Sequence, residues 1–154
     1  LYVNSILAKT EATLAGFDEA ILLTQDGYVS EGAAENIFLV MDGKLVTPSI
    51  SNNILEGITR DSIIQLARNE LGLETVERSI RRSELYNVEE CFLTGTAAHV
   101  TPVGYIDNYQ IGSGETGPIT RELQRLYFDV IRGRMPKYIH WCTPVPATVA
   151  RAST

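Results

Sequence analysis

Cysteine, histidine, lysine and positive charge are all scarce in this chain of 154 residues. Its 2 cysteines and 2 histidines are spread along the sequence, and no pair has the spacing of a zinc site. Acidic side chains outnumber basic ones by 19 to 13, and the net charge of -6 argues against a nucleic-acid surface. No apolar run approaches membrane-spanning length, and the first residues lack the basic region of a signal peptide.

The cysteines also bear on the compartment. Cys91 lies in a short apolar run and is predicted to be a buried free thiol. A chain without an evident disulfide framework fits the reducing cytoplasm, where we expect this protein to be. With 44% hydrophobic residues, the chain can bury one ordinary core, so one domain is expected.

Hydrophobic periodicity predicts helices over residues 3–14, 59–71 and 118–131, which end near Gly16, Gly72 and Gly133. Shorter apolar runs predict strands at 20–24, 28–30, 37–41, 45–47, 74–79 and 90–94. The strands at 37–41 and 45–47 flank Asp42-Gly43-Lys44 and are expected to form a hairpin, and a second hairpin is expected to join 100–106 to 109–111. Helices and strands intermix without a strict βαβ repeat, which favours an α+β fold. The domain is expected to cover residues 1–145. The tail, 146–154, has few bulky apolar residues and is expected to lack fixed structure.

Three segments have the residue types of a site for an anionic ligand. Gly57 precedes Ile58 and Thr59 at the start of the clearest helix, whose free N–H groups can bind oxygens. The small residues at 95–97 follow a buried strand and can form a backbone nest for an anion. Glu31 follows a short strand and precedes a small-residue bend that can direct it inward. Each has an ordinary alternative: Thr59 as an N-cap, 95–97 as a tight turn, and Glu31 as a solvated turn residue.

Together the three motifs resemble the signature of the class IV, fold-type IV pyridoxal 5'-phosphate aminotransferases, and most of all the branched-chain amino acid aminotransferases. The motifs are Ser30-Glu31-Gly32-Ala33-Ala34-Glu35-Asn36-Ile37-Phe38, Leu55-Glu56-Gly57-Ile58-Thr59-Arg60 and Gly95-Thr96-Ala97-Ala98-His99-Val100-Thr101-Pro102-Val103. The resemblance runs from Tyr2 to Val145 and implies the pseudo-barrel-like sheet domain with flanking helices of that fold type. It also implies a homodimer or a higher homo-oligomer.

The resemblance implies a role for each motif. Glu31 would pair with the pyridine nitrogen of the cofactor, which raises the pKa of that nitrogen. Tyr2 would bond the 3-hydroxyl oxygen of the cofactor. The phosphate would be bound by Gly57, Ile58, Thr59, Gly95 and Thr96, and the substrate carboxylate would face the backbone of Thr96 and Ala97.

The Schiff-base lysine of the family lies just before an Asn-Tyr pair, and Tyr2 corresponds to that tyrosine, with Leu1 in place of the asparagine. The chain has three lysines, Lys9, Lys44 and Lys137, and none is at the family position. We therefore expect the chain to be the C-terminal half of an enzyme, inactive by itself, whose N-terminal domain supplies much of the substrate pocket.

Two other functions remain open from the sequence. A D-amino-acid aminotransferase or an aminodeoxychorismate lyase would have the same scaffold, and substrate choice depends largely on the other half. A non-catalytic domain that captures pyridoxal phosphate or another phosphate ligand would also fit, because no lysine can be assigned to catalysis.

Overall fold

The computed structural model describes residues 2–145 and is built around a five-stranded mixed sheet with strand order β5-β4-β3-β6-β7. Its strands are β3 (Asn36–Met41), β4 (Lys44–Thr47), β5 (Thr75–Glu77), β6 (Glu90–Gly95) and β7 (His99–Pro102). β4 and β5 pair in parallel, and the other neighbours pair antiparallel. The three interior strands, β4, β3 and β6, are therefore hydrogen-bonded on both edges.

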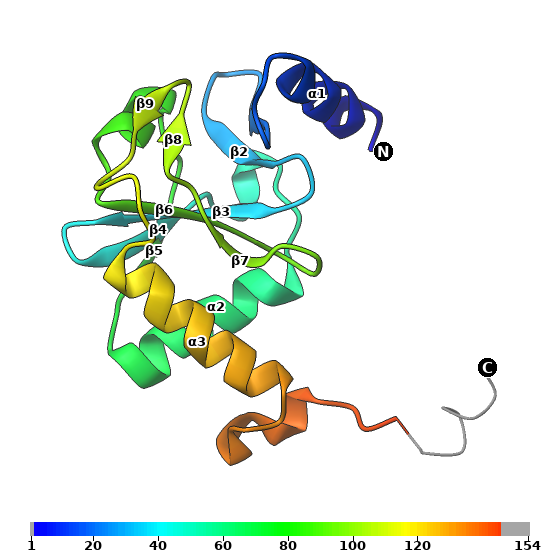
Figure 1. Ribbon diagram of the computed structural model, residues 1–154, viewed down its shortest axis with the longest axis vertical. Coiled ribbons are helices and arrows are strands. Elements are labelled where there is room, and N and C mark those ends of the chain that lie inside the picture. The colour runs from blue at the N-terminus through cyan, green and yellow to red at the C-terminus, as the bar shows by residue number, and fades with distance from the viewer. Residues whose placement is uncertain (1, 146–154) are drawn as a thin grey trace.

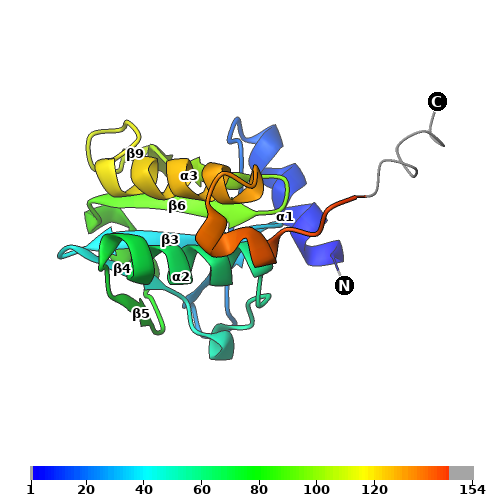
Figure 2. The same cartoon turned by 90° about the horizontal axis from the view of Figure 1, so that it is seen from below.

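Two helices cover one face of this sheet. α2 (Ile58–Leu71) and α3 (Pro118–Ile131) lie side by side against it (Figures 1 and 2). Phe38 and Phe92 are register partners on this face, and their rings stack with centroids 5.1 Å apart. Buried residues of both helices, including Leu66 and Leu123, complete this core. The 3-10 helix η3 (Pro136–Trp141) follows α3 and packs Tyr138 into the same core.

Irregular segments and short hairpins cover the opposite face. They are the pair β1 (Ile21–Leu23) and β2 (Val29–Gly32), the 3-10 helix η2 (Arg82–Asn87), and the pair β8 (Tyr105–Ile106) and β9 (Tyr109–Gln110). The second core lies beneath them and contains Ile37, Leu39 and Leu93 from the sheet with Ile80 and Leu85. Because β3 contributes residues to both cores, it reads as a continuous apolar run rather than an alternating one.

Most of the predicted elements are confirmed. Helices α1 (Val3–Leu14) and α3 have the predicted bounds, and α2 begins one residue before the predicted start. Gly72 ends α2 in the left-handed conformation, with φ of 64°. The turn of the β3–β4 hairpin has positive φ at Asp42 and Gly43, as two-residue hairpin loops require. The α+β class is confirmed.

Two predicted strands are wrong in part. Residues 20–24 were expected to form a buried strand, but β1 pairs only with β2, and Leu23 is 41% exposed. The predicted strand over 100–106 is divided, because β7 pairs with β6 whereas β8 pairs with β9. Local apolar content predicted both segments, but it does not reveal which neighbour each strand pairs with.

Helix α1 lies at the edge of the molecule, beside β2 (Figure 1), and none of its residues is buried. Its apolar residues Ile6 and Leu14 are 62% and 85% exposed. None of the helices within residues 2–145 is long and apolar enough to cross a membrane. The tail predicted at 146–154 lies outside the described residues.

Candidate functional site

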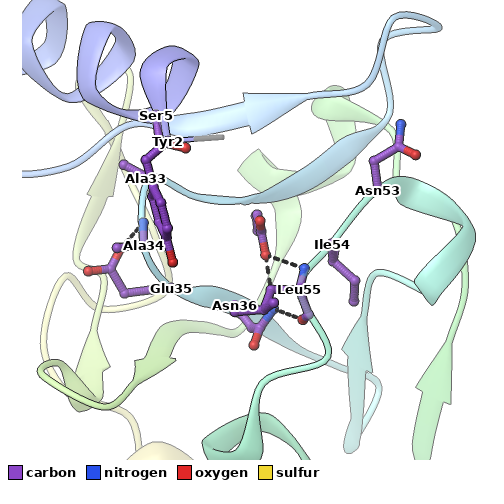
Figure 3. Close-up of a pocket in the computed structure, with 10 residues that line it drawn as sticks. Tyr2, Ser5, Ala33, Ala34, Glu35, Asn36, Asn53, Ile54 and Leu55 are labelled. Atoms are coloured by element: carbon purple, nitrogen blue, oxygen red, sulfur yellow. Dashed lines mark hydrogen bonds between the residues drawn. The ribbon is translucent and has the colours of Figure 1, made fainter.

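A cavity of about 390 Å³ lies between the start of α1, the turn after β2 and the loop before α2. In Figure 3, Tyr2 and residues 33–35 lie on one side of this cavity and residues 53–55 on the other. Glu31 and Asn36 also line it. The cavity therefore brings together Tyr2, the first motif and Leu55 of the second motif. Gly57, Ile58 and Thr59, which were expected to bind phosphate, do not line it.

Glu31 lies at the end of β2 and accepts hydrogen bonds from two donors. Its Oε2 accepts hydrogen bonds from Leu55 N (2.9 Å) and from Asn36 Nδ2 (3.1 Å). Burial raises the pKa of the Glu31 carboxyl above its ordinary value, and the Leu55 N–H bond offsets only part of this. Among the described residues no donor reaches Oε1. Glu31 is thus a partly buried, fixed carboxylate with one oxygen left to bind a cationic or N–H group.

The N-terminus of α2 has no side-chain cap. Gly57 is the N-cap residue, and the first helical hydrogen bond runs from Asp61 N to Gly57 O (3.0 Å). The alternative that Thr59 caps the helix is wrong, because Thr59 lies inside the first turn and is buried, with its Oγ1 3.5 Å from Tyr127 Oη. The N–H groups of Ile58 and Thr59 precede the first helical bond and remain available to an anion.

The N-terminus of α3 provides a contrast. There Glu90 reaches across from β6, and its carboxylate accepts bonds from Ile119 N (3.0 Å), Thr120 N (2.7 Å) and Thr120 Oγ1 (2.6 Å). Both helices begin after a glycine, but only α3 receives a protein carboxylate among the described residues. This difference indicates that α2, not α3, is placed to bind an external anion.

The third motif forms the turn between β6 and β7. Gly95 pairs with His99, and Thr96 and Ala97 are exposed at the tip. A Cβ at Gly95 would lie 3.2 Å from the Ala34 carbonyl oxygen, so this strand end lies against the turn after β2. The structure therefore brings the first and third motifs into contact, although the lining of the cavity does not extend to residues 95–97.

Tyr2 is 65% exposed at the start of α1 and lines the cavity. The three lysines lie elsewhere. Their ammonium groups form surface ion pairs, Lys9 with Glu19 (2.7 Å), Lys44 with Glu74 (2.7 Å) and Lys137 with Glu70 (2.6 Å). Within residues 2–145, none of the lysines lines the cavity.

Sequence reasoning did not single out three residues beside the site. Asn36 contacts Glu31 and the loop before α2, and Glu35 lines the cavity with a carboxyl whose pKa is raised by burial. Thr94 lies opposite Asn36 in the sheet, and its buried hydroxyl has no hydrogen-bond partner among the described residues. The Asn36 side chain could have been noticed from the Glu31 motif, whereas Thr94 looks like an ordinary strand residue.

A larger hollow of about 910 Å³ lies between the second half of α1 and residues 101–108. Its lining is mainly apolar and includes Phe17, Ile21 and Leu85, and it contains none of the predicted cofactor-binding residues. Size alone would favour this hollow, but the fixed carboxylate and the nearby uncapped helix favour the smaller cavity.

The site fits a ligand that combines a phosphate with a ring nitrogen, such as pyridoxal phosphate. A carboxylate at one end suits a protonated ring nitrogen, and the uncapped start of α2 suits a phosphate. Two further features lie next to Asn36. The buried Thr94 hydroxyl, opposite Asn36 in the sheet, has no hydrogen-bond partner among the described residues. Gly57 packs so closely against Asn36 that a Cβ there would lie 2.3 Å from Oδ1.

Comparison with known proteins identifies the family of this chain. The family model described as "Amino-transferase class IV" matches residues 1–106. The chain belongs to the class IV aminotransferase family.

Named relatives and solved structures refine the comparison. The chain is 59% identical over 144 residues to a probable branched-chain amino acid aminotransferase of Aquifex aeolicus, and 44% identical over 144 residues to the branched-chain amino acid aminotransferase of Escherichia coli K12. Each alignment covers 94% of this chain and 46% of the relative. The pyridoxal phosphate form of the Thermobaculum terrenum enzyme superposes with a TM-score of 0.92 at 48% identity, over 94% of this chain and 47% of that one. This chain therefore spans about half the length of the relatives that it matches.

Proposed function

We propose that this chain is the C-terminal, cofactor-binding half of a pyridoxal phosphate-dependent branched-chain amino acid aminotransferase, with residues 1–145 forming the domain. The reaction would move an amino group between leucine, isoleucine or valine and 2-oxoglutarate. One observation carries this proposal. Glu31, a fixed and partly buried carboxylate, accepts a hydrogen bond from Leu55 N, and the loop that contains Leu55 leads into the uncapped start of α2 at Gly57.

Each end of the cofactor would have its own partner. Glu31 would accept a hydrogen bond from the ring nitrogen and keep it protonated, and Tyr2 would bond the ring hydroxyl oxygen. The N–H groups of Ile58 and Thr59 after Gly57, together with Gly95 and Thr96, would bind the phosphate. When bound, pyridoxal phosphate supplies an electron-accepting ring that stabilises the charge left when the substrate α-carbon loses its proton.

The substrate carboxylate would be bound by the exposed turn at Thr96 and Ala97, whose backbone N–H groups are suited to an anion. The lysine that binds the cofactor covalently would lie outside this chain, before Tyr2. The partner N-terminal domain would supply much of the apolar pocket. We further propose that the whole enzyme is a homodimer or a higher homo-oligomer. We also propose that it is cytoplasmic, because free thiols are typical of proteins in a reducing compartment.

Pyridoxal phosphate binding by the 154-residue chain tests the cofactor assignment. We expect the cofactor to bind without a covalent bond, so that borohydride reduction leaves the intact mass at 17.0 kDa. Glu31→Gln should weaken binding about tenfold or more, because a charged hydrogen bond is lost. Glu89→Gln, which changes a carboxylate outside the cavity, is the control. Failure of the wild-type chain to bind would overturn the cofactor assignment, and a reduced adduct on Lys9, Lys44 or Lys137 would overturn the role of the upstream lysine.

Substrate class requires the other half of the enzyme. Joining this chain to the N-terminal half of the Aquifex aeolicus relative, with which it shares 59% identity, should give transamination of L-leucine with 2-oxoglutarate. D-alanine in place of L-leucine is the comparison substrate. A clear preference for D-alanine would replace the branched-chain assignment with the D-amino-acid alternative.

A second function suits the isolated chain. All three lysines are engaged in surface ion pairs, which favours a binding domain that holds pyridoxal phosphate without turning over substrate. Non-covalent binding by the chain, combined with no activity in the joined protein, would support this candidate.

A further inference from the structure

Asn36 lies between the Glu31 carboxylate and the N-terminus of α2. It is the first residue of β3, follows the bend at 33–35, and is only 5% exposed. Its Nδ2 donates to Glu31 Oε2 (3.1 Å) and to Leu55 O (2.8 Å). Leu55 N donates in turn to the same Glu31 oxygen (2.9 Å). Asn36, Glu31 and the backbone N–H and C=O of Leu55 therefore form a closed network of three hydrogen bonds, which appear as dashed lines in Figure 3.

The orientation of the Asn36 amide follows from its neighbours. Both groups that face Nδ2 are acceptors, a carboxylate oxygen and a carbonyl oxygen, so only the NH₂ end of the amide satisfies them. The amide oxygen is consequently turned toward Gly57. A Cβ built on Gly57 would lie 2.3 Å from Asn36 Oδ1, which no side chain tolerates without movement. Gly57 thus permits the start of α2 to approach this amide.

One side chain therefore contacts the carboxylate, the loop and the helix start. Glu31 lies at the end of β2 and the loop leads directly into α2, so these parts reach Asn36 from different elements. A shift of Asn36 would displace Glu31 and the loop together. It would also remove one of the two donors to Glu31 Oε2 and leave Leu55 N alone to orient the carboxylate.

We propose that Asn36 is a positioning residue that sets the distance and orientation of the Glu31 carboxylate relative to the N-terminus of α2. It acts through these neighbours. The functional meaning of this inference rests on the proposed function, in which Glu31 binds a ring nitrogen and α2 binds a phosphate. The network itself can be tested without any cofactor.

The first test is a ¹³C NMR titration of the Glu side-chain carboxyls in the 154-residue chain, with the Glu31 signal assigned by its loss in Glu31→Gln. Asn36→Ala should raise the pKa of Glu31 further, because a partly buried carboxylate loses a donor. Asn36→Asp keeps the shape of the side chain and should raise the pKa of Glu31 more strongly, since a second carboxylate then faces it. Thr47→Val is the matched control, because it removes one buried hydrogen bond in the same sheet, from Thr47 Oγ1 to Ile37 O (2.7 Å), away from Glu31.

A substitution at the start of α2 tests the same network. Gly57→Ala makes no bond to Glu31, but its new methyl group would push against the Asn36 amide. It should therefore raise the pKa of Glu31 in the wild-type background and have a much smaller effect in the Asn36→Ala background, where the obstructing amide is absent. Additive effects of the two substitutions would contradict the coupling.

The third measurement is the affinity for pyridoxine 5'-phosphate, which has the ring nitrogen and phosphate but no aldehyde. Asn36→Ala and Asn36→Asp should each weaken binding about ten- to a hundredfold, and Thr47→Val should leave it unchanged. If the wild-type chain binds no pyridoxine 5'-phosphate, the proposed function fails, while the titration still decides the role of Asn36. If Asn36→Ala behaves like Thr47→Val in the titration, the positioning role is overturned whatever the affinity.

Discussion

Single residues around the turn at 31–36 show how burial changes carboxylate chemistry. Burial raises the pKa of Glu35, the Ala34 N–H bond opposes this shift, and the nearby charge of Glu19 adds to it. Burial also acts on Glu19, but bonds from Lys9 Nζ and from Ala20 N outweigh it and leave the pKa of Glu19 lowered. Glu35 therefore holds its negative charge at a cost, whereas Glu19 is compensated by Lys9.

This difference predicts a pH-dependent effect of Glu35→Gln. A carboxyl whose folded pKa lies above its ordinary value of 4.5 adds stability below that pH and loses this contribution as the pH rises through the folded pKa. Removing the charge should therefore raise the free energy of unfolding relative to wild type at pH 7, and the gain should disappear near pH 4. Urea unfolding across pH 4–8 measures this. Glu115→Gln, at an exposed glutamate, removes the same charge and should show no such trend. An equal trend in both variants would contradict the explanation.

The two thiols should differ sharply in reactivity. Complete burial raises the pKa of Cys91 to about 12, so almost no thiolate forms at neutral pH. Cys142 is only half-buried, with its Sγ 3.3 Å from Val130 O. In the native chain, iodoacetamide should modify Cys142 first, and Cys91 should react only after unfolding. Peptide mass mapping of a time course measures both rates, and early labelling of Cys91 would contradict its burial.

At the scale of elements, α2 and α3 start in the same way but are completed differently. Glu90 satisfies the start of α3, and Gly117 leaves room for it, since a Cβ there would lie 2.0 Å from Glu90 Cδ. Among the described residues, no carboxylate accepts hydrogen bonds from the corresponding groups of α2. A helix N-terminus attracts negative charge through its free N–H groups and dipole, so a carboxylate in one case and a phosphate in the other serve the same purpose.

Removal of the Glu90 carboxylate should destabilise the fold measurably. Glu90→Ala leaves two backbone N–H groups and the Thr120 hydroxyl without their acceptor, which should cost about 2–3 kcal/mol of unfolding free energy. Glu90→Gln keeps one acceptor oxygen and should cost about 1 kcal/mol. The adjacent Glu89→Ala, which loses a single exposed bond from Asp42 N (2.8 Å), should cost less than either. Chemical denaturation of the three variants decides this, and equal losses would contradict the capping role.

At the scale of the whole molecule, the two cores are complete but α1 is not part of either. Val3, Ile6, Leu7 and Leu14 are all more than half exposed, although helices of this kind usually bury their apolar residues. The hollow beside the second half of α1 is likewise mainly apolar. These surfaces are where we expect the proposed N-terminal domain or a second copy of the chain to pack.

The exposed face of α1 should therefore influence association more than stability. Ile6→Gln together with Leu7→Gln should change the free energy of unfolding by less than about 0.5 kcal/mol, because both side chains already contact water. The same pair should reduce self-association of the 154-residue chain in sedimentation velocity. Leu66→Ala is the contrasting variant, since Leu66 is fully buried and its truncation should cost about 2–5 kcal/mol. Strong destabilisation by the α1 pair would mean that the helix packs within this chain.

The sequence by itself determined the local elements and the motif chemistry. Helix limits followed from apolar periodicity and terminal glycines such as Gly72, and the hairpin at Asp42 and Gly43 followed from residues that tolerate positive φ. The roles expected for Glu31, Thr59 and Thr96 came from a resemblance carried by short strings of residues. Such signals are local, because they depend on backbone conformations and neighbours within a few positions.

Tertiary structure alone decided what depends on contacts between distant segments. The exposure of β1, the separation of β7 from β8, and the cap that Glu90 provides for α3 all require knowing which elements meet. The same holds for Asn36, whose partners lie 5 and 19 positions away along the chain and whose amide oxygen faces Gly57. Periodicity identifies the buried face of an element, but pairing, burial and hydrogen bonds across elements arise only when the whole chain packs.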